Sequence, residues 1–383
     1  MIKNNYFNVI DFGSSKIRFS IFDKKKNNKF IETFQVCQNN KETNNFKIIH
    51  QAIKRGEKII SSHIENIILT FDTNSIFIIN ISLSKKIEKK IHIKQLYSSL
   101  ILELKQIIKT NYSNYEIIHI ILTKCIIDET NYYDFPNEKN ITDNLKVDLK
   151  LICYPKKIIS NFIKNFNDIN INVENIFCTS YLKTLNYTKK LNKNKIAFIE
   201  IANKRTSLFV FENKVANLIN SVPIGSYHIT NDISKIFKIN FNEADKIKKS
   251  FNKTDTEFSY QNSNDVNDSI IIKEILDKNI SINQLKEVVL YRVQEIIDLT
   301  LNNSVPFYNS QYLESVELFL IGSGSNLFDS NSFYLNDNFN FKSINFYNET
   351  DIEICNLAVD FYLDNYEIPS INNKKTGLFE KFF

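Results

Sequence analysis

The apolar and polar positions near the start of the chain follow a strand, turn, strand pattern. Two apolar runs, Phe7 to Ile10 and Ile17 to Phe22, flank Asp11 to Lys16, and the second run alternates as a half-buried strand does. The pattern predicts a β-hairpin whose turn carries an acidic residue, a glycine and two hydroxyls. A helix over Asn45 to Ile64 and a strong strand over Ile67 to Phe71 are expected next.

A more polar, alternating stretch from Ser75 to about Lys164 predicts a compact α+β insert. It contains strand patterns over Ile76 to Leu83, Ile117 to Ile121 and Val147 to Cys153, and a helical pattern over Leu96 to Lys109. Because no Pro/Gly/Ser-rich linker marks its edges, its boundaries are expected only to within about four residues.

The second half of the chain repeats the opening pattern. Lys195 to Ile201 is an apolar strand, Ala202 to Arg205 a turn, and Thr206 to Glu212 another strand. A hairpin with an acidic residue near the end of its first strand therefore occurs twice, roughly 190 residues apart. Such an internal repeat carries more weight than either motif alone.

The pattern after the second hairpin predicts further strands and helices around one polar loop. In chain order these are a strand over 218–224, helices over 226–236 and 242–250, a loop over 252–268, a short helix, a long helix over 282–301, and a buried strand over 316–321 that ends in Gly-Ser-Gly-Ser.

The composition draws attention to glycine. The chain has only six glycines in 383 residues, while Asn, Lys, Ile and Phe are abundant, as mutational bias toward A and T would produce. A glycine retained in such a chain is expected where the backbone needs a positive φ or where another group approaches closely. The six are Gly13, Gly56, Gly225, Gly322, Gly324 and Gly377.

Charge and cysteine content limit the possible partners. The net charge of +5 comes from 48 basic and 43 acidic residues without a long basic block, which argues against a nucleic-acid partner. Five widely spaced cysteines without a CxxC pair suggest neither a disulfide framework nor a zinc site, so a reducing cytoplasm is expected. No signal peptide is recognised, and no segment approaches the roughly 20 apolar residues of a spanning helix.

Two glycine- or hydroxyl-bearing hairpin turns are a suitable arrangement for holding phosphates. Turn amides and hydroxyls donate to phosphate oxygens, and a flanking carboxylate can hold magnesium through water. Asp11 to Lys16 would form one phosphate loop and Glu200 to Ser207 the other. The glycines after the strand over 316–321 could approach a nucleoside. An ordinary hairpin or strand-to-helix turn is the alternative for each piece.

Five segments together resemble the actin-like ATPases and, within them, the FtsA family of bacterial cell-division proteins. The resemblance covers nearly the whole chain, and HITNDI after a glycine turn is its most specific motif. The segments are NVIDFGSSKIRFSIF (8–22), VPIGSYHITNDI (222–233), NEADKIK (242–248), EVVLYRVQEI (287–296) and LFLIGSGSNL (318–327).

The resemblance implies an α/β, actin-like (ribonuclease H-like) two-domain fold with a nucleotide cleft and an FtsA-type α+β insert subdomain. Five parts are expected in that arrangement. They are a first actin-like domain (1–83 with 164–190), the insert (84–163), a second actin-like domain (191–232 and 303–367), a helical/β subdomain of it (233–302), and a linker with an amphipathic tail (368–383).

The resemblance also implies a site for ATP and magnesium. Asp11 and Glu200 would hold the metal through water. The residues expected around the nucleotide are Gly13, Ser14, Ser15, Lys16 and Thr206 at the phosphates, Gly225 in a connecting turn, and Asp245, Lys248, Gly322, Gly324 and Ser325 at the nucleoside.

The second phosphate loop departs from the family. Where the family has Asp-x-Gly-Gly-Gly-Thr, this chain reads EIANKRTS from Glu200 to Ser207, with no glycine. Lys204 and Arg205 could place charge directly on the phosphates. Alternatively the loop binds nucleotide weakly. We favour binding with weak or no ATPase activity, which the resemblance also implies.

The resemblance implies three interactions beyond the nucleotide: a filament of the protein itself, the FtsZ C-terminal tail, and the inner face of the cytoplasmic membrane at the division septum. Arg292 is the candidate for the FtsZ tail, with an exposed helix charge as the alternative. The membrane residues are Leu378, Phe379, Phe382 and Phe383, which fall on one face of a helix. That tail could instead pack on its own domain.

Two other functions share this pattern. A PilM-like pilus-assembly protein would bind a pilus partner, and a small-molecule kinase of the same superfold would need a catalytic acid or base. HITNDI and the amphipathic end argue against the first, and the sequence supplies no convincing acid or base for the second.

Overall fold

The structure, a computed structural model, describes most of the chain in two compact units. The described residues are 6–36, 42–87, 91–132, 140–141, 144–250, 280–302, 310–322, 324–325, 340–347 and 349–365. The first unit takes its described residues from Met1–Lys193, Glu212–Asn217 and Thr350–Phe383. The second takes them from Asn194–Phe211 and Leu218–Glu349.

The first unit is built on a five-stranded sheet of order β11-β4-β1-β2-β3. The predicted hairpin is confirmed, and its antiparallel register sets Asp11 opposite Arg18. β4 and β11 continue the sheet in parallel. The strands are β1 (Tyr6–Phe12), β2 (Lys16–Asp23), β3 (Asn28–Gln35), β4 (Asn66–Phe71) and β11 (Asn172–Cys178).

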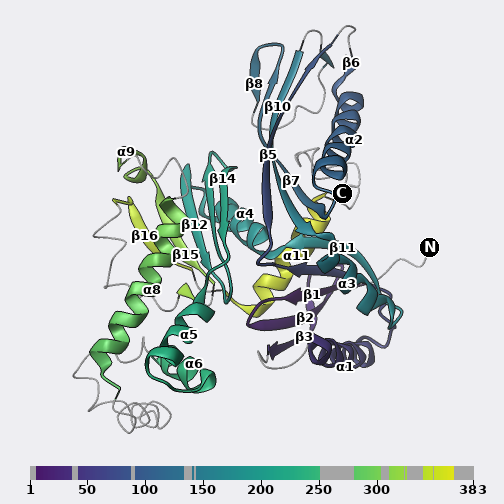
Figure 1. Ribbon diagram of the computed structural model, residues 1–383. Coiled ribbons are helices and arrows are strands. Elements are labelled where there is room, and N and C mark those ends of the chain that lie inside the picture. Colours follow the sequence, from purple (N-terminus) through teal and green to yellow (C-terminus); the bar gives the residue numbers. More distant parts are fainter. Residues whose placement is uncertain are drawn as a thin grey trace. The chain divides into compact units, whose positions relative to one another are not determined.

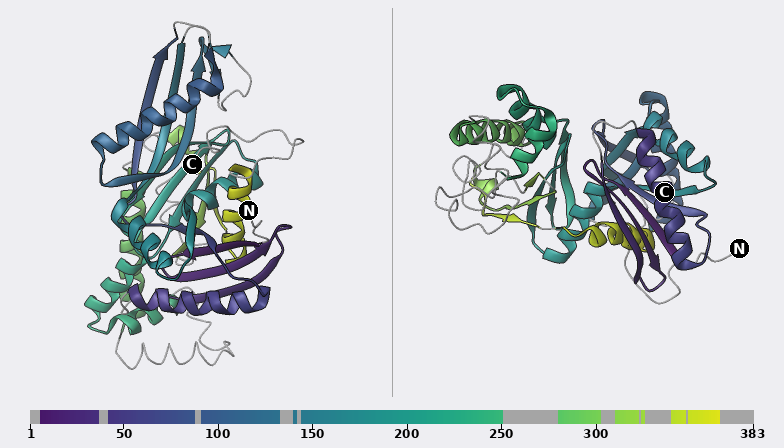
Figure 2. Two further views of the ribbon diagram at one scale, coloured as in Figure 1. Left: turned by 90° about the vertical axis from the view of Figure 1, so that its right-hand side faces the viewer. Right: turned by 90° about the horizontal axis from the view of Figure 1, so that it is seen from below.

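Helix α1 (Glu42–Ile60) packs on β2 and β3 of this sheet, as Figure 2 shows. Gly56 lies at the closest approach, where an added Cβ would meet Ile21 Cδ1 at 2.7 Å and Phe19 Cε1 at 3.0 Å. This glycine therefore has a packing role that its position in a predicted helix does not reveal.

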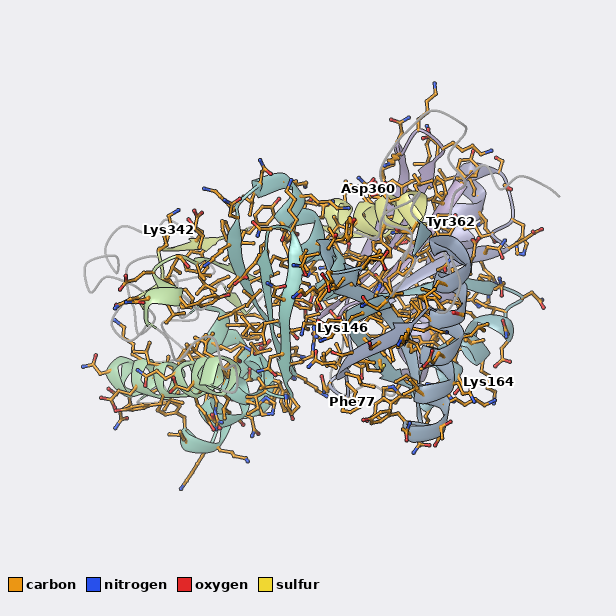
Figure 3. All side chains as sticks on the ribbon, turned by 90° about the horizontal axis from the view of Figure 1, so that it is seen from above. Phe77, Lys146, Lys164, Lys342, Asp360 and Tyr362 are labelled. Atoms are coloured by element: carbon orange, nitrogen blue, oxygen red, sulfur yellow. The ribbon has the colours of Figure 1, made fainter. Side chains whose placement is uncertain are left out.

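Helices α3 (Lys156–Asn167) and α4 (Thr179–Leu191) follow strands of the first unit, and α11 (Asp351–Asn365) packs on α4, β1 and β2. Figure 3 labels Asp360 and Tyr362 on α11. Asp360 pairs with Lys26, and the Tyr362 hydroxyl donates to Glu174 at 2.6 Å. The expectation that residues 303–367 all belong to the second domain is therefore wrong for this helix, because its buried face covers the first sheet.

The insert is a four-stranded antiparallel sheet of order β5-β10-β7-β8, with α2 along one face (Figure 1). A separate apolar cluster, which includes Leu100, Leu104 and Val147, fills the space between α2 and the sheet. The elements are β5 (Phe77–Lys86), β6 (Ile91–His92), α2 (Ile93–Asn111), β7 (Tyr115–Ile127), β8 (Thr130–Tyr132), β9 (Asn140–Ile141) and β10 (Asn144–Pro155).

Several of the expected part boundaries fall inside secondary-structure elements. Residue 83 lies within β5, 163 within α3, and 232 within α5 (Ser226–Ile236). The sheet of the insert begins at Phe77 and its last strand ends at Pro155, so the insert is shifted toward the N-terminus. Continuous strands and helices join the parts, which explains why no linker composition marks them.

The second unit repeats the architecture with a sheet of order β14-β13-β12-β15-β16. One apolar core joins β12, β13 and β15 to α5, α6 and α8, which Figure 1 shows beside the sheet. Its remaining elements are β12 (Lys195–Ile201), β13 (Thr206–Glu212), β14 (Val215–Val222), α6 (Phe241–Ser250), α8 (Ile282–Asn302), α9 (Ser310–Leu313), β15 (Glu317–Ile321) and β16 (Ser343–Phe346). None of the described helices has the length and apolar composition needed to cross a membrane.

His119 connects the insert to the first sheet. It lies on β7, is buried, and its Nε2 accepts the backbone N–H of Cys178 at 2.9 Å. Its ring packs against Phe177, Tyr181 and Phe361. Burial lowers the pKa of this imidazole from 6.5 to about 3, so it stays neutral and keeps its acceptor lone pair.

The neutral state of His119 predicts a pH dependence of stability. Between pH 6.5 and about 3 the unfolded chain binds a proton on this side chain and the folded chain does not. The free energy of unfolding should therefore fall as the pH falls, by up to about 1.4 kcal/mol per pH unit from this group. Urea unfolding of His119→Gln should show a shallower acid dependence, whereas the control His50→Gln should keep the original slope. An unchanged slope in His119→Gln would contradict this role.

Candidate functional site

The carboxylate of Asp11, at the end of β1, is fully buried and held by three donors. Thr70 and Thr179 each donate a hydroxyl to Oδ1 at 2.8 Å, and Arg18 Nη1 donates to Oδ2 at 2.7 Å. Three segments far apart in the sequence therefore meet at the residue expected to hold magnesium.

Arg18 connects Asp11 to α11. Its Nε donates to Asp351 Oδ1 at 2.6 Å, and Lys16 Nζ lies 3.7 Å from the other oxygen of Asp351. Burial opposes the charge of Arg18, but the charges of Asp11 and Asp351 outweigh it and raise the pKa of the guanidinium. Arg18 therefore remains a fixed positive charge at the base of the first hairpin turn.

The turn of the first hairpin keeps the groups that a phosphate contact requires. Ser14 is exposed, Gly13, Ser15 and Lys16 are half-buried, and the Lys16 side chain is 39% exposed. An added Cβ at Gly13 would meet the Lys16 carbonyl oxygen at 2.6 Å and Arg18 Nη1 at 3.1 Å. Glycine therefore allows this turn to close over the Asp11–Arg18 pair.

The second hairpin contains a similar pair, buried more completely. Arg205 Nη2 donates to Glu200 Oε2 at 3.0 Å, with side chains 2% and 4% exposed, and Arg205 Nη1 donates to the Ser207 hydroxyl at 2.7 Å. Thr206 donates its hydroxyl to the Ile224 carbonyl at 2.8 Å. Arg205 thus points toward Glu200, while Lys204 is exposed with Nζ 5.3 Å from the centre of the Tyr227 ring.

The turn from Ala202 to Arg205 is packed against the start of α5. The amides of Ser226 and Tyr227 donate to the carbonyls of Ala202 and Asn203 at 3.0 and 2.7 Å. A Cβ at Gly225 would lie 2.4 Å from the Ala202 oxygen. The first two N–H groups of α5 therefore bond to this turn. His228 lies at the helix start, where its Nδ1 accepts the Gly225 N–H at 3.1 Å.

The glycines after β15 contact the same segment from another direction. Gly324 donates its N–H to the Ile201 carbonyl at 2.9 Å, and a Cβ there would meet that oxygen at 2.6 Å. Gly322 has a φ of +84°, which L side chains rarely adopt. Ser325 donates its hydroxyl to the Gly322 carbonyl at 2.6 Å. The segment after β15 therefore packs against Ile201, the last residue of β12.

Asp245 and Lys248 pair with each other and join α6 to α5. Lys248 is buried and its Nζ contacts Asp245 at 2.9 Å, Thr230 Oγ1 at 2.5 Å and the Ser226 carbonyl at 3.2 Å. Burial lowers the pKa of the Lys248 ammonium, with Asp245 opposing it. This cluster stabilises the helix pair, and its role at a nucleoside stays a prediction.

Arginine is as informative as glycine in this chain. The sequence contains only four, Arg18, Arg55, Arg205 and Arg292, among 48 basic residues. Arg55 pairs with Glu32, and Arg292 Nε donates to Asp232 at 2.5 Å while its Nη1 contacts Glu295. Each of the four forms an ion pair, which fits the planar fork that lysine lacks.

Sequence reasoning missed Arg18, Thr70 and Thr179, which donate to Asp11, and Asp351, which accepts from Arg18. A polar residue within the buried strand 66–71 was a usable signal for Thr70. The antiparallel pairing of the hairpin, counted outward from its turn, could have placed Arg18 opposite Asp11. Asp351 could not be found in this way, since α11 comes more than three hundred residues later.

The two acids do not fit a magnesium ion in this structure. A carboxylate that holds Mg²⁺, directly or through water, needs lone pairs that face the metal and its water shell. Here Asp11 accepts three protein donors, and Glu200 lies buried against a guanidinium. Within the described ranges, no group of three or more His, Cys, Asp or Glu side chains lies close enough to hold a metal.

Comparison with solved structures places this geometry in a known fold. A structure titled "PilM-PilN type IV pilus biogenesis complex" matches with a TM-score of 0.59 and 10% identity over 91% of this chain and 89% of that chain. MreB 5 of Spiroplasma citri bound to AMPPNP matches with a TM-score of 0.50 and 10% identity over 94% and 96%. The chain has the actin-like ATPase fold, a two-domain α/β architecture.

A family model matches one part of the chain, under half of its length. The family model "Cell division protein FtsA" matches residues 197–327, from within β12 to just past β15. A comparison with curated protein sequences gives no significant match. The chain therefore combines an actin-like fold with an FtsA-like segment in its second half.

The buried pair of the second hairpin predicts a large stability effect. Arg205→Gln should lower the free energy of unfolding by about 3 kcal/mol or more, because Glu200 would be left buried without its counter-charge. Arg205→Lys should also destabilise the fold, since an ammonium lacks the planar fork with which the guanidinium bonds to Glu200 and Ser207 at once. Urea denaturation measures both effects.

The matched control removes a cation from an exposed pair. Lys189 lies 3.6 Å from Asp364 with side chains 54% and 49% exposed. Lys189→Ala should change the free energy of unfolding by less than about 1 kcal/mol. Equal effects of Arg205→Gln and Lys189→Ala would contradict the importance of the buried pair.

Proposed function

We propose that this chain is an actin-like cell-division protein that binds ATP, polymerises on the inner face of the cytoplasmic membrane and anchors FtsZ filaments at the division septum. The FtsA match over residues 197–327 carries the proposal. That segment holds the second hairpin, α5, α6, α8 and β15. Its HITNDI motif (228–233) lies in α5 directly after Ser226 and Tyr227, whose amides bond to the Ala202–Arg205 turn.

ATP is the nucleotide that the fold and the first hairpin favour. The exposed Ser14 and the half-buried Gly13, Ser15 and Lys16 offer hydroxyls, amides and a cation to phosphate oxygens. A related fold, MreB 5, is described with bound AMPPNP. Because the second turn bonds to α5 and its arginine is buried, we infer binding with little or no hydrolysis.

We infer that the surface of α5 and α8 around Arg292 binds the FtsZ tail mainly through apolar residues of that peptide, because Asp232 and Glu295 already pair with Arg292. Tyr291 is 68% exposed and Ile236 57% exposed, and Arg292 ties the two helices together through Asp232. We call Asp232, Ile236, Tyr291, Arg292 and Glu295 the α5–α8 surface. Exposed aromatic and apolar side chains beside an arginine are typical of peptide-binding hot spots.

Membrane attachment rests on the sequence of the C-terminal tail. Leu378, Phe379, Phe382 and Phe383 lie outside the described residues, so the tail remains a prediction from its amphipathic spacing. Barely two turns of helix bind a membrane weakly one at a time, and a filament would supply many tails together. Polymerisation and membrane binding are therefore coupled in this proposal.

A PilM-like role is the second candidate. The likeness to a PilM–PilN complex, with a TM-score of 0.59, favours it, but at 10% identity that likeness concerns the fold. A pilus protein would use a pilus partner in place of FtsZ. Binding of an FtsZ tail peptide separates the two.

An FtsZ tail peptide should bind the purified full chain through the α5–α8 surface. Tyr291→Ala and Arg292→Ala should each weaken binding at least about tenfold, because each removes a hot-spot contact of 1.4 kcal/mol or more. Fluorescence anisotropy of a labelled peptide measures this. Leu102→Ala is the control, since Leu102 is 68% exposed on α2 of the other unit. Undetectable binding to the unsubstituted chain would refute the FtsZ role.

Deleting the residues after Ser370 should abolish sedimentation with anionic liposomes, because the apolar face of the tail would be lost. Phe382→Ser with Phe383→Ser in the full chain should give a similar loss. Replacing Asn372 and Asn373 of the linker with serine should leave sedimentation unchanged. If the truncated chain still sediments with liposomes, another surface is the anchor.

A further inference from the structure

The two hairpins of the internal repeat share a charge arrangement that the FtsA resemblance does not predict. Each has an acidic residue near the end of its first strand and an arginine from the same hairpin bonded to it. Asp11 pairs with Arg18 across the register of β1 and β2 at 2.7 Å. Glu200 pairs with Arg205 from its own turn at 3.0 Å. An acid paired with an arginine of its own hairpin therefore occurs in both halves of the repeat.

An arginine beside each acid supplies a permanent positive charge at the position where a metal ion is expected. Its guanidinium stays protonated at any physiological pH, so neither pair releases its acid by titration. A magnesium ion would have to displace a buried guanidinium and then tolerate that charge nearby. Asp11 has in addition two threonine hydroxyls on its other oxygen.

Cations also surround each turn where phosphates are expected. Lys16 and Arg18 flank the first turn, beside Asp11 and Asp351, and Lys204 and Arg205 lie in the second, beside Glu200. Lys16 and Lys204 are the accessible members. Magnesium in a nucleotide site neutralises phosphate charge, and an accessible lysine can do part of the same directly.

We propose that the chain binds its nucleotide as the metal-free polyphosphate, with Arg18 and Arg205 holding the two hairpin acids in place of magnesium. The inference rests on the proposed ATP binding. It adds that neither acid is a metal ligand and that Lys16 of the first hairpin meets the phosphates. A lack of metal at the phosphates also agrees with weak or absent hydrolysis.

The first test measures the affinity of the purified full-length chain for a fluorescent ATP analogue. One buffer contains magnesium at about fivefold excess over the analogue, enough to saturate it, and the other contains EDTA. The affinity for total ATP should be equal or higher in EDTA, because excess magnesium converts ATP into its magnesium complex and lowers the concentration of the metal-free form. Affinity lost by tenfold or more in EDTA would overturn the inference and leave the proposed function intact. Absence of binding in both buffers would instead refute ATP binding.

A second measurement tests whether the two acids bind metal, even if the chain binds no ATP. Electron paramagnetic resonance counts free Mn²⁺ as the full chain is titrated with it, alone and with ATP. We expect no Mn²⁺ bound by the protein alone and, with ATP present, only the amount that ATP binds in buffer. Stoichiometric Mn²⁺ binding that disappears in Asp11→Asn or Glu200→Gln would show that these acids are metal ligands, contrary to the inference.

Substitution of Lys16 tests the positive half of the inference. Lys16→Gln should weaken nucleotide binding about tenfold in EDTA, because it removes an accessible cation from a phosphate. Lys235→Gln, which removes a cation from the last turn of α5, is the control and should bind as the unsubstituted chain does. Unchanged affinity in Lys16→Gln would overturn the proposed phosphate contact.

Discussion

The buried ion pair between Glu200 and Arg205 is the constraint on which the second hairpin depends. Both side chains are almost completely buried, so each charge is tolerable only while its partner is in place. The pair fixes the turn from Ala202 to Arg205. Carbonyls of this turn accept hydrogen bonds from the first two amides of α5. The position of the HITNDI helix is therefore determined by a charge pair at the expected magnesium position. The Asp11–Arg18 pair has the corresponding role in the first hairpin, where it also reaches α11 through Asp351.

The distribution of glycine follows from this constraint. The turn from Ala202 to Arg205 has no glycine, but the segments packed on it do: Gly225 lies against Ala202, while Gly322 and Gly324 lie against Ile201. The scarce glycines therefore mark close approaches of backbone within the protein. This changes their interpretation, because close approach to a nucleotide is no longer needed to explain why these positions lack a side chain.

The sequence predicted local structure well and long-range assembly less well. Both hairpins and the helix over 226–236 were predicted because their apolar periods and turn residues are local signals. The placement of α11 on the first unit and the true edges of the insert were not, since burial partners hundreds of residues away determine them. The candidate site shows the same division. Asp11 and Glu200 were found as unusual acids at strand ends, but the arginines that neutralise them depend on register and side-chain direction, which composition and spacing do not contain.

The most direct test of this account is a crystal structure of the full chain grown with ATP and Mn²⁺, using the anomalous signal of manganese to locate metal. We expect nucleotide density at the Gly13–Lys16 turn, intact Asp11–Arg18 and Glu200–Arg205 pairs, and no manganese within coordination or water-bridging distance of either acid. Manganese bound at Asp11 or Glu200, with its arginine displaced, would contradict it.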